Sequence, residues 1–277
     1  MTYSMRFPLL ALALAATSVT ASAQPKAAKG KPACGVTLLP LVVGNQWTYS
    51  FVPAPVAATP AIARTAPATP KGFVITVKNV ETKGADTVVS LEEKLTYDYT
   101  KDPKKQIIEE RVVNSTITCN AKKFDISPDS FFFAGEPGGF QGLAIDKLDR
   151  KGTSIVLTGG KIGEAEWPED LTIVYSKKPF ASSNATMQNG KLELERRVTP
   201  AEAEDVATKS MVYPKAEKLA IKTSGRVTLD KPISPNPKPM ELPADWVSIL
   251  WFSPGTGLVQ SDNKYAHRYQ LVDSQLK

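Results

Sequence analysis

Few residues of this chain have side chains that could perform catalysis. His267 is the only histidine, and a serine or cysteine nucleophile needs a base of this kind beside it. The pattern places His267 on the last expected strand, in phase with Tyr265, Tyr269 and Leu271, which favours a packed or rim position over a catalytic one. We therefore expect no catalytic residue and no enzymatic activity.

The sequence lacks the residues that usually form metal and cofactor sites. One imidazole and two cysteines are fewer than the three or four ligands that zinc needs once the sulfurs are oxidised. The run Gly159-Gly160-Lys161 resembles a phosphate-binding loop only in part, because Ile155 stands where the first glycine belongs and no Ser or Thr follows the lysine. We expect no metal and no cofactor.

Paired carboxylates are the remaining source of chemistry, since glycoside hydrolysis needs only two acids across a cleft. The pairs are Glu92 with Glu93, Glu109 with Glu110, and Asp146 with Asp149. Adjacent residues on a strand point to opposite faces, so a solvated sheet edge explains the pairs better. A carboxylate-dependent hydrolase is kept as a second alternative function.

The N-terminus has the order typical of a secretory signal peptide. Arg6 supplies the positive charge, residues 7–16 form an apolar run, and Ala21-Ser22-Ala23 is a small-residue cleavage pattern. The run is too short for a bilayer, which needs about 20 residues. We expect a signal peptide over residues 1–23, a periplasmic or secreted protein, and no transmembrane segment in the mature chain.

The charge pattern argues against nucleic acid as a partner. The chain has 34 basic and 28 acidic residues, and they are not gathered into a basic patch of the kind that binds nucleic acid. The local groups are Lys26, Lys29 and Lys31, and Lys101, Lys104 and Lys105. We assign the first to a flexible leader over residues 24–35 and the second to a turn, with loose contact to an acidic surface as the alternative.

Cys34 and Cys119 are the only cysteines. A disulfide between them is expected, because an exported chain folds in an oxidising compartment. A Cys-x-x-Cys pair would instead be typical of redox chemistry. The chain-entropy model gives roughly 4.5 kcal/mol for a loop of this length, as an upper guide.

Alternation of apolar and polar residues predicts strands along most of the chain. The four earliest strands carry these residues on one face: Trp47, Tyr49 and Phe51; Phe73, Ile75 and Val77; Val89, Leu91, Leu95, Tyr97 and Tyr99; Ile107, Val113, Ile117 and Cys119. Turns at residues 83–86 and 101–104 connect the last three strands into an antiparallel meander.

Six further strands are expected over residues 153–158, 171–175, 191–198, 219–229, 246–252 and 265–272. A helix from Thr199 to about Met211 competes for a place, because Thr199 and Pro200 are typical of a helix start. The prediction is a mainly β fold: a single antiparallel, curved sheet or half-barrel of about ten strands with at most one or two short helices. A sandwich or a closed sheet stays open at this point.

Two proline-rich stretches interrupt the strands of the expected domain, which spans residues 36–277. Residues 53–70 read as an Ala/Pro-rich loop and residues 232–243 as a polyproline-like strap. A surface position is expected for both, with a docking site for a partner as the alternative for the strap.

Two motifs carry a resemblance to a loose group of uncharacterised exported bacterial β proteins. Residues 40–49 (PLVVGNQWTY) are similar to their opening motif Pro-Leu-x-x-Gly-Asn-x-Trp-x-Tyr, and residues 251–259 (WFSPGTGLV) to their closing motif Trp-aromatic-x-Pro-Gly-x-Gly-Leu-Val. The resemblance implies the same fold over most of the mature chain. Some such proteins look similar, at fold level, to the lipoprotein-localisation half-barrels, whose curved sheet wraps an apolar cavity.

The closing motif also has a structural meaning. Pro254, Gly255 and Gly257 suit the fixed and positive dihedral angles of a tight turn, across which Trp251 is expected to pack near Leu258. We interpret these residues as a fold signature.

The candidate apolar site consists of Phe131, Phe132, Phe133 and Phe140, beside a glycine-containing loop over residues 135–142 that could act as a lid. Simple filling of the core is the favoured alternative. Three functions remain open: a non-catalytic envelope protein that binds an apolar small molecule or lipid in the curved sheet, a module that binds another envelope protein, and the hydrolase. Binding is favoured over catalysis.

Overall fold

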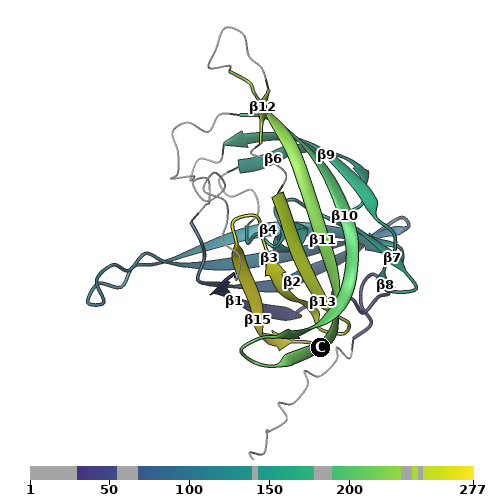
Figure 1. Cartoon of the computed structure of the whole chain (residues 1–277), viewed down its shortest axis with the longest axis horizontal. Helices are drawn as coiled ribbons and strands as arrows, with labels where there is room; N and C mark the ends of the chain where they lie inside the picture. The colour runs from purple at the N-terminus through teal and green to yellow at the C-terminus, as the bar shows by residue number, and fades with distance from the viewer. Residues whose placement is uncertain (1–29, 55–67, 139–142, 178–188, 232–238, 243–245) are drawn as a thin grey trace, which may run out of the picture.

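The structure is a computed structural model that describes residues 30–54, 68–138, 143–177, 189–231, 239–242 and 246–277 (Figure 1). The predicted signal peptide, Phe140 and most of both proline-rich stretches lie outside the described residues.

Strands dominate the described residues, so the mainly β fold class is confirmed. There are fifteen: β1 (Gln46–Pro53), β2 (Gly72–Lys83), β3 (Asp86–Asp98), β4 (Ile108–Asn120), β5 (Lys123–Ile126), β6 (Leu143–Gly152), β7 (Ile155–Thr158), β8 (Lys161–Ile162), β9 (Trp167–Lys177), β10 (Gly190–Ala207), β11 (Val212–Leu229), β12 (Met240–Glu241), β13 (Trp246–Ser253), β14 (Gly257–Asp262) and β15 (His267–Gln275). A four-residue helix, α2 (Phe131–Ala134), is the single helix of the described part.

The strands form one antiparallel sheet in the order β6-β9-β10-β11-β13-β14-β15-β1-β2-β3-β4-β5-β7-β8, with β12 paired to β11. In Figure 1 the green strands β9 to β11 cross the blue strands β2 to β4 at a steep angle. Residues 153–154 alone connect β6, at one end of this order, to β7, near the other. The sheet is therefore strongly curved, and its two ends lie close together.

The predicted meander is present as β2, β3 and β4, each antiparallel to the next. Cys119 on β4 is fully buried and is bonded to Cys34, with 5.6 Å between the two Cα atoms and 85 positions between them in sequence. The predicted disulfide is confirmed.

The helix considered from Thr199 onward is a strand. Residues 199–207 continue β10, and Thr199 and Pro200 pair with Ala220 and Leu219 of β11. Pro200 lacks an N–H group, but a strand with register shifts tolerates this loss. Tertiary pairing with β11 thus overrides the local helix signal.

The two sequence motifs from opposite ends of the chain meet in the core. The Trp47 indole N–H donates to the carbonyl of Thr256 at 2.6 Å, and the Tyr49 hydroxyl donates to the carbonyl of Leu258 at 2.7 Å. Gly257 has a φ of +103°, and a Cβ atom there would lie 3.1 Å from the Trp47 Nε1 atom. A side chain at this position would be strained and crowded, so the turn requires glycine.

Candidate functional site

Glu93 is a carboxylate inside the apolar core. It lies on β3 in phase with buried leucines and is fully buried. Its Oε1 atom accepts from the Ser115 hydroxyl at 3.0 Å and from the Phe131 backbone N–H at 2.9 Å. Burial raises the pKa of the Glu93 carboxyl to about 7, although hydrogen bonds from Phe131, Ser130 and Ser115 lower it in part.

Glu93 positions the start of helix α2. The Phe131 N–H also lies 3.1 Å from the Oε2 atom of Glu93, so both carboxylate oxygens face this donor. Ser130 is the N-cap residue, and its hydroxyl accepts from the Phe132 N–H at 3.3 Å. Gly135 closes the helix in the left-handed conformation with a φ of +64°. The carboxylate therefore fixes where the phenylalanine run sits.

A second buried charge cluster holds the two ends of the sheet together. Glu169 on β9 is fully buried and forms ion pairs with Arg196 on β10 and with Arg150 on β6, the latter at 2.9 Å. The Ser154 hydroxyl donates to Glu169 at 2.8 Å and accepts from the Ile126 N–H of β5 at 3.0 Å. Side chains here replace the backbone ladder between β5 and β6.

Arg196 joins this cluster to the phenylalanine run. Its side chain is buried, its Nη2 atom donates to the Phe133 carbonyl at 2.7 Å, and its guanidinium lies 3.8 Å from the centre of the Phe133 ring. Burial lowers the pKa of the guanidinium, and Glu169 opposes that shift. Because Glu169 and Arg196 are paired and enclosed, their arrangement serves packing and closure.

The structure places the predicted apolar residues in the core. Phe131 and Phe132 are fully buried and Phe133 is 7% exposed, while Phe140 lies outside the described residues. The Phe131 ring centre lies 4.8 Å from that of Tyr49 and 4.6 Å from that of Phe73.

The closing-motif residues lie at the turn between β13 and β14. Gly255 has a φ of +81° and its N–H donates to the Thr37 carbonyl at 2.8 Å. Trp251 is buried and donates its indole N–H to Glu204 at 2.6 Å. Pro254 precedes the two turn glycines.

His267 is half-buried at the start of β15. Its Nε2 atom lies 3.2 Å from the Thr69 hydroxyl, and its ring packs edge-on against Phe51 at 5.6 Å. Burial lowers the pKa of the imidazole. Among the described residues, no group of three or more His, Cys, Asp or Glu side chains could hold a metal ion.

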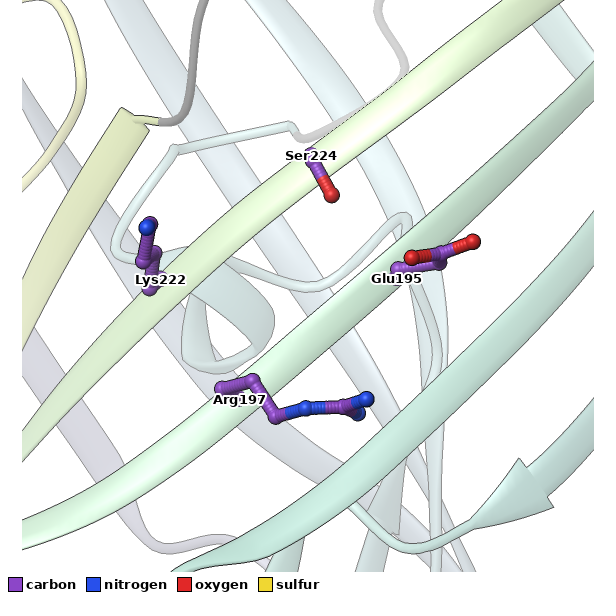
Figure 2. A pocket seen from close by; sticks show the side chains of 4 residues that line it. All are labelled: Glu195, Arg197, Lys222 and Ser224. Carbon is purple, nitrogen blue, oxygen red and sulfur yellow. The ribbon is translucent and has the colours of Figure 1, made fainter.

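The outer face carries a small polar depression on β10 and β11. Figure 2 shows its four lining residues, Glu195, Arg197, Lys222 and Ser224, which form two cross-strand pairs. Its volume is about 130 Å³, below the roughly 300 Å³ at which small-molecule sites begin. Arg197 also lies 3.9 Å from Asp170, so its charge is already partly compensated.

Sequence reasoning missed the buried charges Glu93, Glu169 and Arg196. The solvated-edge interpretation is wrong for Glu93, which is fully buried. The signal was present, because Glu93 falls on the same parity as Leu91 and Leu95, and the other two likewise interrupt apolar faces. A charge in phase with a buried face indicates a satisfied polar group in the core.

Comparison with known proteins gives similarity of fold only. No family model and no curated protein matches the sequence. A crystal structure from Bacteroides fragilis, classed as an exported protein with a YmcC-like fold, is 11% identical, with a TM-score of 0.45 over 87% of this chain and 99% of that one. A structure from Parabacteroides distasonis, classed as a lipoprotein, is 12% identical, with a TM-score of 0.44 over the same shares. Similarity at this level carries no argument about activity.

Proposed function

We propose that this chain is an exported, non-catalytic binding module that meets its partner with the outer surface of its sheet. This proposal takes the interaction module in preference to a carrier that encloses an apolar ligand. The observation that carries it is the occupation of the sheet's interior by aromatic side chains of the chain itself.

The aromatic rings form one continuous packed group. Phe132 lies edge-on to Trp47 at 6.0 Å between ring centres, and Tyr269 lies edge-on to Phe73 at 5.3 Å. Phe131 stands between them, 6.0 Å from Tyr269 and 5.8 Å from Phe132. Rings at these distances are in contact in favoured geometries. An apolar ligand in this position would have to displace the phenylalanine run.

The polar groups of the described interior support a non-catalytic role. Glu93 accepts hydrogen bonds from the start of α2, and Glu169 is paired with two arginines. A general acid or base must reach a substrate proton, and both of these carboxylates are fully buried. Of the pairs that motivated the hydrolase alternative, Glu92 with Glu93 gives it no support, because Glu93 is enclosed in the core.

Export is supported by the signal-like N-terminus and by the disulfide. A buried bond between Cys34 and Cys119 is typical of an oxidising compartment. None of the helical segments in the described part of the chain has the length and hydrophobicity needed to cross a bilayer.

Native mass spectrometry of the mature chain, purified from the cell envelope without detergent, tests the proposal. We expect the mass of the chain cleaved after Ala23, with one disulfide and no adduct. A stoichiometric adduct of lipid mass that survives gentle desolvation would contradict it and support the enclosed-ligand alternative.

A further inference from the structure

The hairpin of β3 and β4 extends beyond the sheet as an arm. The last pair between β2 and β3 is Gly72 with Thr96, whereas β3 and β4 continue to the pair Asp98 with Ile108. Figure 1 shows this arm, in blue, projecting at the left of the molecule. We define the arm as residues 96–112, in which residues 111 and 112 form the base, opposite the last residues of β3 that also pair with β2.

Local contacts give the arm a defined shape. At its base Lys71 forms an ion pair with Asp98 at 2.8 Å. The Arg111 guanidinium lies 4.4 Å from the centre of the Tyr97 ring and donates to the Tyr99 hydroxyl at 3.2 Å. These contacts join both strands at the base of the arm, so the arm has a defined conformation in the fold.

The tip is also ordered. The Lys104 N–H donates to the Asp102 carboxylate at 3.0 Å, and the Lys105 N–H donates to the Asp102 carbonyl at 2.8 Å. The Ile107 N–H donates to the Thr100 hydroxyl at 2.9 Å. Asp102 thus closes the turn through its own side chain, as Asp commonly does.

The tip is basic and solvent-exposed. The turn contains three lysines, Lys101, Lys104 and Lys105, and one acid, Asp102. All four residues are exposed. None of the three lysines forms an ion pair with another described residue. Two acids further along the arm are paired, Asp98 with Lys71 and Glu109 with Arg111, whereas the exposed Glu110 has no ion pair with another described residue. Residues 96–112 carry four basic and four acidic side chains, and the excess of positive charge is confined to the tip, where there are three lysines and one aspartate.

Exposed apolar side chains gather beside these lysines. Nine large apolar side chains are exposed among the described residues, and four of them lie on the arm: Tyr99 at 38%, Ile107 at 54%, Ile108 at 44% and Val112 at 53%. Ile108 and Val112 lie on the same face of β4, and Ile107 directly precedes this strand. These apolar side chains lie beside the basic tip, so an arm that lies along a lipid interface would bring both groups to it together.

We propose that the arm docks onto an anionic lipid surface, with its lysines at the headgroups and its isoleucines at the acyl boundary. A basic group beside apolar side chains is the combination that binds such surfaces. The inference rests on the proposed function, since an exported chain would meet a membrane surface with its exterior. It names that surface as the partner.

Vesicle flotation of the oxidised mature chain measures the docking. Binding to phosphatidylcholine vesicles that contain phosphatidylglycerol is expected, with weak binding to phosphatidylcholine alone and loss in high salt. A lysine near an anionic surface strengthens partition about fivefold, so replacing Lys101, Lys104 and Lys105 by glutamine should weaken it roughly 100-fold. The pair Ile107→Ser and Ile108→Ser should weaken it about tenfold or more.

Matched controls remove the same groups elsewhere on the surface. The triple change of Lys151, Lys161 and Lys209 to glutamine removes the same charge from exposed positions on β6, on β8 and after β10, none of which forms an ion pair with another described residue. The pair Val212→Ser and Val247→Ser removes exposed apolar side chains from β11 and β13. Both controls should bind vesicles as the unaltered chain does. All variants are exposed substitutions, and an unchanged thermal melt verifies their folding.

Three results would overturn the docking proposal. The first is no binding of the unaltered chain to anionic vesicles at low salt. The second is an equal loss in arm and control variants, which would show a general charge effect. The third is a dimer of the unaltered chain that the isoleucine variants convert to a monomer, which would assign the arm to a second copy. The proposed function fails separately, by a lipid adduct in native mass spectrometry that persists when the three arm lysines and the two isoleucines are replaced, because such a lipid is enclosed by the sheet rather than docked on the arm.

Discussion

Replacing Glu93 by glutamine removes a buried titratable group without changing the size of the side chain. The Gln oxygen can still accept from the Phe131 N–H, and the Ser115 hydroxyl can rotate to accept from the new amide. The perturbation therefore isolates the ionisation of Glu93. It tests the claim that this carboxyl lies in the dry interior of the sheet.

The magnitude follows from the pKa of Glu93. Burial raises this pKa from 4.5 to about 7 in the folded chain, so the folded state holds a proton that the unfolded state has already lost. Stability is fully retained below about pH 4.5, falls as the pH rises through this window, and levels off above about pH 7. A difference of about 2.5 pKa units corresponds to about 3 kcal/mol. The stability of the Glu93→Gln chain does not fall in this way, because glutamine does not ionise.

Urea unfolding followed by tryptophan fluorescence measures the effect on the oxidised mature chain. The stability of Glu93→Gln relative to the unaltered chain should rise by about 3 kcal/mol between about pH 4.5 and about pH 7. Glu92→Gln is the matched control, because Glu92 points outward and pairs with Lys78 at 3.4 Å. That exposed pair contributes under about 1 kcal/mol. A Glu93→Gln difference that is constant across the pH range would refute the reasoning.

Three further substitutions test the disulfide, the charge cluster and the core, each by the same urea unfolding. Cys34→Ser leaves Cys119 unpaired and should lower the free energy of unfolding by up to about 4.5 kcal/mol; no loss would show that the bond constrains little. Glu169→Gln leaves Arg196 buried without its counter-charge and should lower the free energy of unfolding by about 3 to 5 kcal/mol. A loss below about 1 kcal/mol, as for an exposed ion pair, would show that the cluster is solvated. Phe132→Ala should lower the free energy of unfolding by about 3 to 5 kcal/mol, and a change below about 1 kcal/mol would mean that this ring is not packed.

The alternation of residues predicted most of the sheet because period-two patterns report half-buried strands. It worked best on β2 and β3, where one face is apolar over many residues. Strands β5, β6, β8, β12 and β14 were missed for different reasons. β5 alternates but has only four residues. β8 and β12 have two residues each, β6 is rich in charge, and β14 is buried on both faces, so none of these four shows a clear alternation.

The curvature that brings the two ends of the open sheet together depends on contacts that local patterns do not encode. Arg150 donates to the Ile126 carbonyl of β5, which is not paired with β6. Ser154 bonds both Glu169 of β9 and the Ile126 N–H. The meeting of Trp47 with Thr256 is of the same kind, although both motifs were visible in the sequence. The alternation of residues along each strand would have indicated that these charged residues face inward. Only the fold shows which residues they contact.

The side chains of this chain fill the inside of its own sheet. A crystal structure of the mature protein purified from the cell envelope would show this interior. We expect the Phe131 and Phe132 rings to contact Tyr49, Phe73 and Trp47. Continuous non-protein density between these rings, with helix α2 displaced from Glu93, would contradict this expectation.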